Sequence, residues 1–378
     1  MKTRRIIYIL EAYKSAHGGV ANIYEHVEIL ADNGFNAFVC LPQKPVVDFY
    51  RSDAPLIIHG GNITIEKGDI FVIPEGILNY VNALRGMPCK RFMFCQNHYY
   101  LPFSDNPSLG ISEFPVHEVI VSSETLRSFF QQVYGLPNLP LIPCAIDTDI
   151  FSNKGRKRRQ IAYMPRKLRK ESAFIKATFS RIYKEYAEIP WIAIDDVERL
   201  EVAKIMAESE IFLSLSDKDS LGLPPLEAMA SGCLVAGFHG DGGREYMTQN
   251  NGWWAESGDW KACVNGIASA LRLLESGGQQ LEEMKRHIAA TVEGYSRTRM
   301  KEELLKFWGQ EIIKPYTYEI AGETVGIQTL PIIDSHLFQI DQDRGQKNRE
   351  RSRRAHSTKH FYLLRGLFNT VRQFIQNK

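Results

Sequence analysis

The chain has 378 residues, more than a single hydrophobic core usually serves, so two domains are expected. Its composition, with 44% hydrophobic and 24% charged residues, excludes a largely disordered protein, and a net charge of +2 gives no ground for nucleic-acid binding. No apolar run approaches the ~20 residues of a membrane span. The six cysteines form no CxxC pair, which indicates buried free thiols and a cytoplasmic protein.

The first forty residues predict a βαβ unit. Residues 6–10 are a compact apolar run that is too short for a signal peptide and suits a buried parallel strand. Apolar residues at helical spacing follow a Gly18-Gly19 turn and end at Asn33-Gly34, and residues 35–41 form the next strand. Such a unit favours a parallel, doubly wound sheet.

The strand and helix pattern continues and then starts again after the polar segment 153–159, which we interpret as a linker. We therefore expect two doubly wound domains, residues 1–155 and 156–296. The predicted strands are 69–74, 91–96 and 118–123 in the first domain and 160–165, 191–195, 211–216 and 233–238 in the second.

The turn between the strand 211–216 and a short helix at 224–231 predicts an anion site. Pro224 and Pro225 suit the first turn of a helix, where N–H groups have no partner within the helix. The remaining N–H groups and the positive end of the helix dipole face the loop, and Gly222 lets the backbone approach a ligand. A phosphate fits such a site.

Two carboxylates, Asp219 and Glu227, flank this turn. They would repel a phosphate, but carboxylates accept hydrogen bonds and sugars are rings of hydroxyl donors. We expect Glu227 in the first turn of the helix, where it also complements the dipole. Hydroxyls on both sides of a diphosphate describe a nucleotide sugar, with a ribose at one end and a transferable sugar at the other.

The stretch DSLGLPPLEAMASG (219–232) resembles the signature of the retaining glycosyltransferases of family 4 (group 1), in which two glutamates are separated by seven residues. Residues 16–40 are similar to the first glycine loop and helix of that family. Residues 142–151 and 239–247 resemble its I-P-N-G-I-D segment and its later Gly-Gly-x-x-Glu loop. The resemblance covers residues 5–310. It implies the GT-B fold, two Rossmann-like domains facing a central cleft.

The resemblance also implies roles for the residues of the turn. Glu227 would hold the ribose hydroxyls, and the backbone of Gly222 and Leu223 would meet the phosphates. Asp219 would lie beside the transferred sugar as a catalytic residue. The family has a glutamate at this position. The side chain of Asp219 is one methylene shorter, which leaves its role open.

A basic clamp on the diphosphate is the next implied feature, because the leaving nucleotide gains negative charge in the transition state. The segment MPRKLRKES (164–172) lies where the family carries its Arg and Lys. We choose Arg166 and Lys170, although the spacing differs from the usual one and a solvated basic loop is the alternative.

Four further residues follow from the resemblance. Gly18 and Gly19 would face the cleft beneath the donor, and a plain strand-to-helix turn is the alternative. His98 stands where the family often has a histidine near the transferred sugar, so it is a second catalytic candidate; a structural histidine is the alternative. Glu245 either belongs to the donor site or caps a helix.

Two D-x-D patterns, Asp147 to Asp149 and Asp217 to Asp219, imitate a metal site of the other large glycosyltransferase fold. The first lies between the domains and the second within the donor motif. GT-B enzymes use helix dipoles and basic side chains instead, so we predict no metal and no cofactor beyond the nucleotide-sugar co-substrate.

The remaining chain predicts a crossover helix at 297–313, which would return to the first domain, and an extension at 314–378. Between residues 341 and 378 there are ten Lys or Arg and three acids. Residues 361–378 have apolar residues at helical spacing among basic ones, a pattern that suits an anionic membrane surface, and docking on protein is the alternative.

The sequence thus predicts a retaining glycosyltransferase that moves a sugar from a nucleotide-sugar donor to a hydroxyl acceptor, sugar or lipid-linked. Polysaccharide, glycolipid or glycoconjugate synthesis is the expected setting, in the cytoplasm or on the inner face of the membrane. A non-catalytic scaffold of the same fold, or a nucleotide-sugar epimerase, is the alternative.

Overall fold

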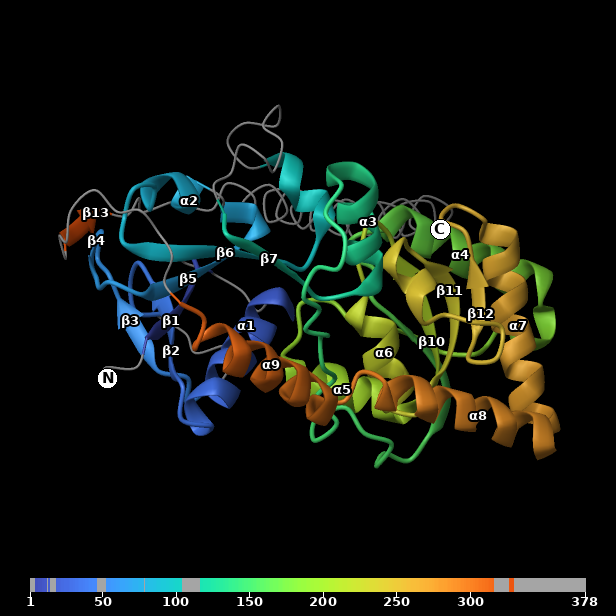
Figure 1. Ribbon diagram of the computed structural model, residues 1–378. Coiled ribbons are helices and arrows are strands. Elements are labelled where there is room, and N and C mark those ends of the chain that lie inside the picture. The colour runs from blue at the N-terminus through green and yellow to red at the C-terminus, as the bar shows by residue number, and fades with distance from the viewer. Residues whose placement is uncertain are drawn as a thin grey trace, which may run out of the picture. The chain divides into compact units, whose positions relative to one another are not determined.

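The computed structural model describes residues 4–11, 13, 18–45, 52–77, 79–103, 116–315 and 326–329. All of them belong to one compact unit, residues 1–333 (Figure 1). Residues 104–115 and the basic segment 361–378 lie outside the described residues.

The first half of the chain forms a six-stranded sheet, which we call the N-terminal sheet. Every neighbouring pair in it is parallel, and the order is β3-β2-β1-β5-β6-β7. Strand order reverses between β1 and β5, the point beyond which α/β proteins bind ligands. Its strands are β1 (Arg5–Ile9), β2 (Asn36–Leu41), β3 (Leu56–Ile58), β5 (Asp69–Pro74), β6 (Cys89–Cys95) and β7 (Glu118–Val121).

The second half forms a separate five-stranded sheet, the C-terminal sheet, with the order β12-β11-β10-β8-β9 and parallel neighbours. Its order reverses between β8 and β10, so the carboxyl ends of these two strands mark its ligand edge. Its strands are β8 (Arg158–Tyr163), β9 (Trp191–Ala193), β10 (Ser209–Ser216), β11 (Leu234–His239) and β12 (Trp253–Ala255).

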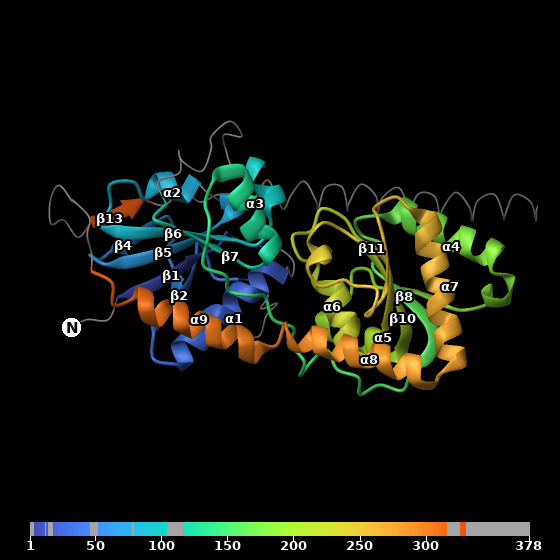
Figure 2. The same ribbon diagram turned by 45° about the vertical axis from the view of Figure 1, so that its right-hand side comes forward.

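Helices cover both sheets (Figure 2). The N-terminal sheet carries α1 (Gly18–Asp32), α2 (Asn79–Ala83) and α3 (Glu124–Tyr134). The helices of the second half are α4 (Arg169–Ile182), α5 (Arg199–Glu208), α6 (Leu223–Ala230), α7 (Trp260–Ser276) and α8 (Gly278–Glu293), and α9 (Arg297–Glu311) follows them. Two parallel, doubly wound α/β domains confirm the predicted fold class.

Helix α9 packs on the first half of the chain although it comes last in the sequence. Met300, Leu304 and Trp308, spaced for one helical face, lie in the same buried cluster as β1 and α1. Trp308 Nε1 donates to Tyr8 Oη at 3.2 Å, and α9 lies alongside α1 in both views (Figures 1 and 2). Ser296 is the N-cap of α9, and its side chain accepts a hydrogen bond from the N–H of Arg299. This cap marks α9 as a new helix after α8.

Three features differ from the sequence prediction. Strand β8 begins at Arg158, inside the segment 153–159 that we expected to be a linker. The first two residues of this strand, Arg158 and Arg159, are exposed, so the segment lacks the apolar character on which the strand prediction relied. Strands β3 and β12 have only three residues each, too few for a periodic signal. β4 (Asn62–Ile65) pairs antiparallel with β13 (Gly326–Thr329) from the expected C-terminal extension, a long-range pairing that no local pattern indicates.

Candidate donor site

The loop from β10 to α6 has the form that the prolines predicted. Helix α6 begins at Leu223, and Pro224 and Pro225 are its second and third residues. Gly222 is its N-cap with φ +84°, a left-handed conformation that favours glycine. Tyr246 Oη donates to the Gly222 carbonyl at 2.7 Å and fixes the turn.

Glu227 lies in the second turn of α6, not in the first as we expected, because the helix begins at Leu223. Its side chain is partly buried and accepts no hydrogen bond within the described part of the chain. Burial raises the pKa of Glu227 to about 7; Arg199 partly offsets this, and Asp147 adds to it. The site therefore holds an acceptor whose charge is sensitive to pH near neutrality.

Asp219 is paired with a lysine. Its Oδ1 lies 2.5 Å from Lys167 Nζ, in the basic loop after β8. Arg166 and Lys170, which we chose for the clamp, are exposed and make no ion pair with any described residue. Arg169 binds Asp195 at 2.6 Å. Of the basic residues 166–170, the structure therefore brings Lys167 to the motif.

The loop that follows β11 is fixed against the motif loop. The Gly242 N–H donates to the Asp219 carbonyl at 2.7 Å. A Cβ at Gly242 would lie 1.9 Å from the Ser220 carbonyl carbon, closer than any real contact. Only glycine fits there, and its neighbour Asp241 is held beside the motif.

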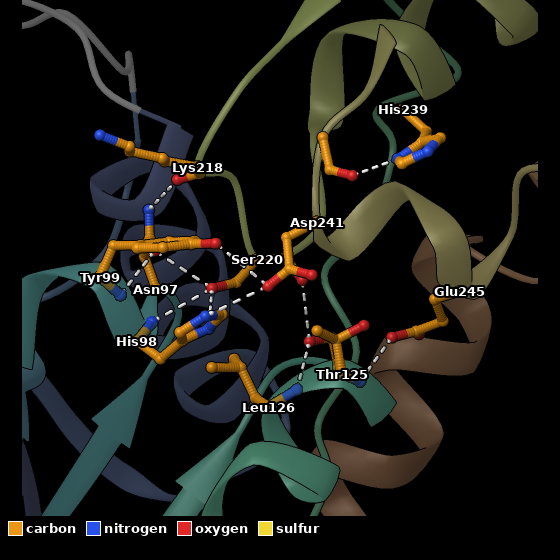
Figure 3. A network of polar contacts seen from close by, with 12 residues as sticks. Asn97, His98, Tyr99, Thr125, Leu126, Lys218, Ser220, His239, Asp241 and Glu245 are labelled. Atoms are coloured by element: carbon orange, nitrogen blue, oxygen red, sulfur yellow. Dashed lines mark hydrogen bonds and ion pairs between the residues drawn. The ribbon is translucent and has the colours of Figure 1, made fainter. Parts of the chain in front are cut away.

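His98 joins the two sheets at this loop (Figure 3). It follows β6, and its backbone N–H donates to Ser220 Oγ at 3.1 Å. Its ring Nδ1 lies 2.8 Å from the same oxygen, and its Nε2 lies 3.3 Å from Asp241 Oδ2. Tyr99 Oη donates to Asp241 Oδ2 at 3.2 Å. The carboxyl end of β6 therefore binds the donor motif and the loop after β11 at once.

The hydrogen bonds fix one tautomer of His98. Burial lowers the pKa of His98, although Asp241 acts in the opposite direction, so the ring is neutral at pH 7. A carboxylate can only accept, so Nε2 carries the proton and Nδ1 accepts from the Ser220 hydroxyl. Asn97 Oδ1, 3.1 Å from that hydroxyl, is its alternative acceptor.

The same contacts argue against a nucleophilic serine. Ser220, His98 and Asp241 are the residue types of a hydrolase triad. Ser220 is only 2% exposed, and its hydroxyl also accepts the His98 N–H. The imidazole also contacts the rings of Phe129 and Tyr99, with centroids 4.5 and 4.3 Å away. The group is thus a rigid contact between the two sheets.

Glu245 caps a helix, which was one of its two expected roles. Its Oε2 accepts the N–H of Thr125 in the first turn of α3 at 3.0 Å, and its Oε1 accepts from Tyr295 Oη at 3.1 Å. Ser123 caps the same helix and donates its hydroxyl to the Ser220 carbonyl at 3.2 Å. Glu245 therefore stabilises the first turn of α3 by accepting one of its backbone N–H groups.

The glycine pair opens α1 and reaches the motif helix. A Cβ on Gly18 would lie 3.1 Å from Leu223 Cδ1 at the start of α6. Gln96 Nε2 donates to the Gly19 carbonyl at 2.9 Å. The structure thus brings Gly18, Gly19, Gly222 and Leu223 into one region.

Sequence reasoning missed four contributors to this site, Asn97, Tyr99, Ser220 and Asp241. Their importance comes from contacts between segments more than 100 residues apart, which no spacing rule reveals. The one local signal was the position of Asp241 directly before Gly242-Gly243, since a residue next to a tightly packed glycine pair is fixed in place.

A separate cavity of about 480 Å³ lies between α4 and the carboxyl ends of β8 and β9, lined by Tyr163, Arg169, Lys176 and Asp195 among others. Within the described ranges, no cluster of three or more His, Cys, Asp or Glu side chains is arranged to hold a metal ion. Nor does any helix described there have the length and apolar character needed to cross a membrane.

Comparisons with known proteins point to one class. Residues 191–287, which include the motif, match the family model "Glycosyl transferases group 1". The chain is 29% identical over 295 residues to an alpha-1,6-glucosyltransferase of Actinobacillus pleuropneumoniae serotype 7 (strain AP76), covering 71% of this chain and 89% of that protein.

Two solved structures share the fold. A glycosyltransferase from Rickettsia africae ESF-5 has a TM-score of 0.62 at 14% identity, over 83% of this chain and all of that one. A mutant of S. aureus TarM, in complex with fondaparinux, alpha-GlcNAc-glycerol and UDP, has a TM-score of 0.62 at 10% identity, over 82% and 100%. The chain therefore has the GT-B fold, and its segment 191–287 is similar to the glycosyl transferases of group 1.

Proposed function

We propose that this protein is a retaining glycosyltransferase that transfers a sugar from a nucleotide-sugar donor to a hydroxyl acceptor. The observation that carries the proposal is the β10–α6 turn. A glycine-capped helix start, opened by two prolines, faces the start of α1. One turn further along α6 lies Glu227, whose carboxylate has no hydrogen-bond partner among the described residues. The match of residues 191–287 to group 1 glycosyltransferases supports it.

In this proposal the backbone of Gly222 and Leu223 meets the diphosphate, and Gly18 and Gly19 face the cleft beneath the donor. Glu227 accepts hydrogen bonds from the ribose hydroxyls, for which it has free lone pairs. Lys167 joins Arg166 and Lys170 as a cation available to the leaving diphosphate.

Asp219 and His98 are proposed to border the transferred sugar. Each is already engaged, Asp219 by Lys167 and His98 by Ser220 and Asp241. A phosphate that attracts Lys167 would release Asp219 for a sugar hydroxyl. Contact between His98 and the sugar would require one ring nitrogen to exchange its partner.

UDP-glucose is the donor that we propose first. The curated relative is named a glucosyltransferase, and the TarM complex contains UDP. An acceptor hydroxyl on a growing glycan or a lipid-linked sugar, with synthesis of a polysaccharide, glycolipid or glycoconjugate, fits that proposal.

Isothermal titration calorimetry with UDP tests the nucleotide site. Wild-type protein should bind UDP, and Glu227→Ala should weaken binding by about 10- to 100-fold, because two hydroxyls lose a charged acceptor. Glu201→Ala, a change of an exposed glutamate on α5, is the matched control. Equal affinity of wild type and Glu227→Ala would remove the proposed role of Glu227.

Metal-independent transfer is part of the proposal, since the proposal assigns the charge of the phosphates to basic side chains and a helix start. Transfer measured after treatment with EDTA should retain its rate. A loss of activity with EDTA that Mg²⁺ or Mn²⁺ restores would contradict this part alone.

We further propose a reducing, cytoplasmic setting with peripheral membrane contact through 361–378. All six cysteines are buried and free, and the segment combines apolar periodicity with Arg365 and Arg372. Sedimentation with phosphatidylserine vesicles should fall when residues 341–378 are deleted. Equal sedimentation of the full and shortened chains would contradict membrane contact.

A further inference from the structure

We propose that Asp241 is the carboxylate that selects the transferred sugar. The inference rests on the proposed function and adds to it a specificity residue. Asp241 stands on the loop after β11 and lies in the contact network between the two sheets (Figure 3).

The two oxygens of Asp241 are in different situations. Oδ2 receives two donors, His98 Nε2 at 3.3 Å and Tyr99 Oη at 3.2 Å. Oδ1 has no hydrogen-bond or ion-pair partner among the residues that the structure describes, and the side chain is 42% exposed. The first oxygen thus anchors the carboxylate, and the second is free to accept.

The anchoring is rigid enough to position Oδ1. His98 is buried, contacts two aromatic rings and has a partner at each ring nitrogen. The backbone beside Asp241 is fixed as well, since the Gly242 N–H donates to the Asp219 carbonyl and Gly242 packs on Ser220 without room for a Cβ. A preorganised acceptor loses little entropy on binding a hydroxyl.

Two other polar side chains near this loop are engaged in the structure. Lys167 holds Asp219 at 2.5 Å, and both nitrogens of His98 have partners. Asp241 Oδ1 is therefore an acceptor that a sugar hydroxyl at this loop can use without displacing a partner. A site built to hold a hydroxyl rejects an analogue that lacks it, because the acceptor is left unpaired.

In this account His98 and Tyr99 are positioning residues for Asp241. Both come from the segment after β6, and Asp241 comes from the segment after β11. The selecting carboxylate is therefore correctly placed only while these two segments are in contact.

Kinetics of Asp241→Asn with UDP-glucose and its 2-, 3-, 4- and 6-deoxy analogues test the proposal. Wild type should prefer UDP-glucose over one analogue by a large factor. Asp241→Asn should lower kcat/KM for UDP-glucose about 10- to 100-fold and should abolish the preference at that one position. Affinity for UDP alone should stay within about twofold.

Asp217→Asn is the matched control, because it removes the same charge from a loop within electrostatic range of Tyr99 and should preserve every preference. Tyr99→Phe should cost a few-fold in wild type and nothing in the Asp241→Asn background, since it acts through Asp241.

The possible outcomes separate the two proposals. If Asp241→Asn keeps wild-type discrimination at all four hydroxyls, or if it weakens UDP and UDP-glucose equally, the assignment of Asp241 is wrong while the glycosyltransferase proposal stands. If wild type turns over none of the donors, the proposed function fails, and with it the specificity role of Asp241.

Discussion

At the scale of single residues, Glu227 would make the proposed nucleotide binding depend on pH. Its pKa in the folded protein, about 7, is raised from 4.5 by burial. Since the folded state holds this proton more tightly than the unfolded state, the stability contributed by the neutral form is full below pH 4.5 and is lost as the pH rises through 7. The ionised form that suits ribose hydroxyls becomes the major form only above about pH 7.

UDP affinity should therefore rise with pH in wild type more than in Glu227→Gln. For a pKa near 7 the ionised fraction grows about tenfold between pH 6 and pH 8, and the ratio of the two dissociation constants should change by a similar factor. Calorimetry at pH 6, 7 and 8 measures it. Titration of UDP itself affects both proteins equally, so parallel profiles would contradict the assignment.

At the scale of elements, helix α6 is fixed at both ends. Its start is tied by Tyr246, and its far end by Lys157, whose ammonium donates to the carbonyls of Ser231 at 2.7 Å, Ser209 at 2.8 Å and Met206 at 3.3 Å. These carbonyls end α6, begin β10 and belong to the last turn of α5. A cation there also complements the helix dipoles.

Removing this cation should destabilise the protein. Lys157→Met keeps the length of the side chain but removes the charged donor from three carbonyls, of which only those of Met206 and Ser209 keep a contact with the Cys233 thiol. We expect a loss of roughly 2–3 kcal/mol in the free energy of unfolding. Urea denaturation followed by circular dichroism measures it. Lys154→Met, at an exposed position, is the control; equal midpoints for the two variants would show that the contacts contribute little.

The glycine that packs the β11 loop on the motif gives a second prediction. Gly242→Ala places a methyl group within 1.9–2.3 Å of the Ser220–Leu221 backbone, so the loops must move apart and activity should fall at least about tenfold. Gly309→Ala on α9 meets no atom within 4 Å and should be neutral or stabilising by about 0.5–1 kcal/mol. Full activity of Gly242→Ala in the transfer assay would contradict the close contact.

At the scale of the whole molecule, the end of α9 is locked to the N-terminal sheet by a buried ion pair. Lys90 Nζ lies 2.6 Å from Glu311 Oε1, and both side chains are largely buried. A buried charge that loses its partner is costly, whereas replacing both charges with apolar groups is often tolerated.

A double-mutant cycle on this pair tests how firmly α9 is held. Glu311→Leu leaves Lys90 buried without its partner and should cost roughly 3–5 kcal/mol of unfolding free energy. Lys90→Met should cost less, because Glu311 keeps Lys314 Nζ at 2.5 Å, and the double variant should cost less than the sum of the two. Additive losses in urea denaturation would show that the two charges act independently.

Much of the architecture could be predicted from the sequence, because many of its elements carry a local signal. Buried parallel strands such as Ile6–Leu10 read as short apolar runs, and α6 carried its own start signal in Pro224 and Pro225. The short strands β3 and β12 carry no periodic signal, and the pairing of β4 with β13 joins segments about 260 residues apart. Local patterns cannot show such pairings.

The candidate site, like the fold, could be predicted from the sequence only in part. One local motif contains Gly222, Leu223 and Glu227, so the sequence alone could predict that they lie together. The contacts of His98 with Ser220 and Asp241, and the pairing of Lys167 instead of Arg166 or Lys170 with Asp219, depend on how two sheets meet. Choosing among adjacent basic residues requires the direction of each side chain, which spacing alone does not give.

The central claim is tested most directly by following the anomeric protons of UDP-glucose with NMR during incubation with the full-length protein and a panel of sugar and lipid-linked acceptors. The account predicts release of UDP and a new α-linked glucose signal, retained relative to the donor, both lost in Glu227→Ala that remains folded. A folded wild-type protein that leaves UDP-glucose and a panel of other UDP-, GDP- and ADP-sugars intact, or a β-linked product, would contradict it.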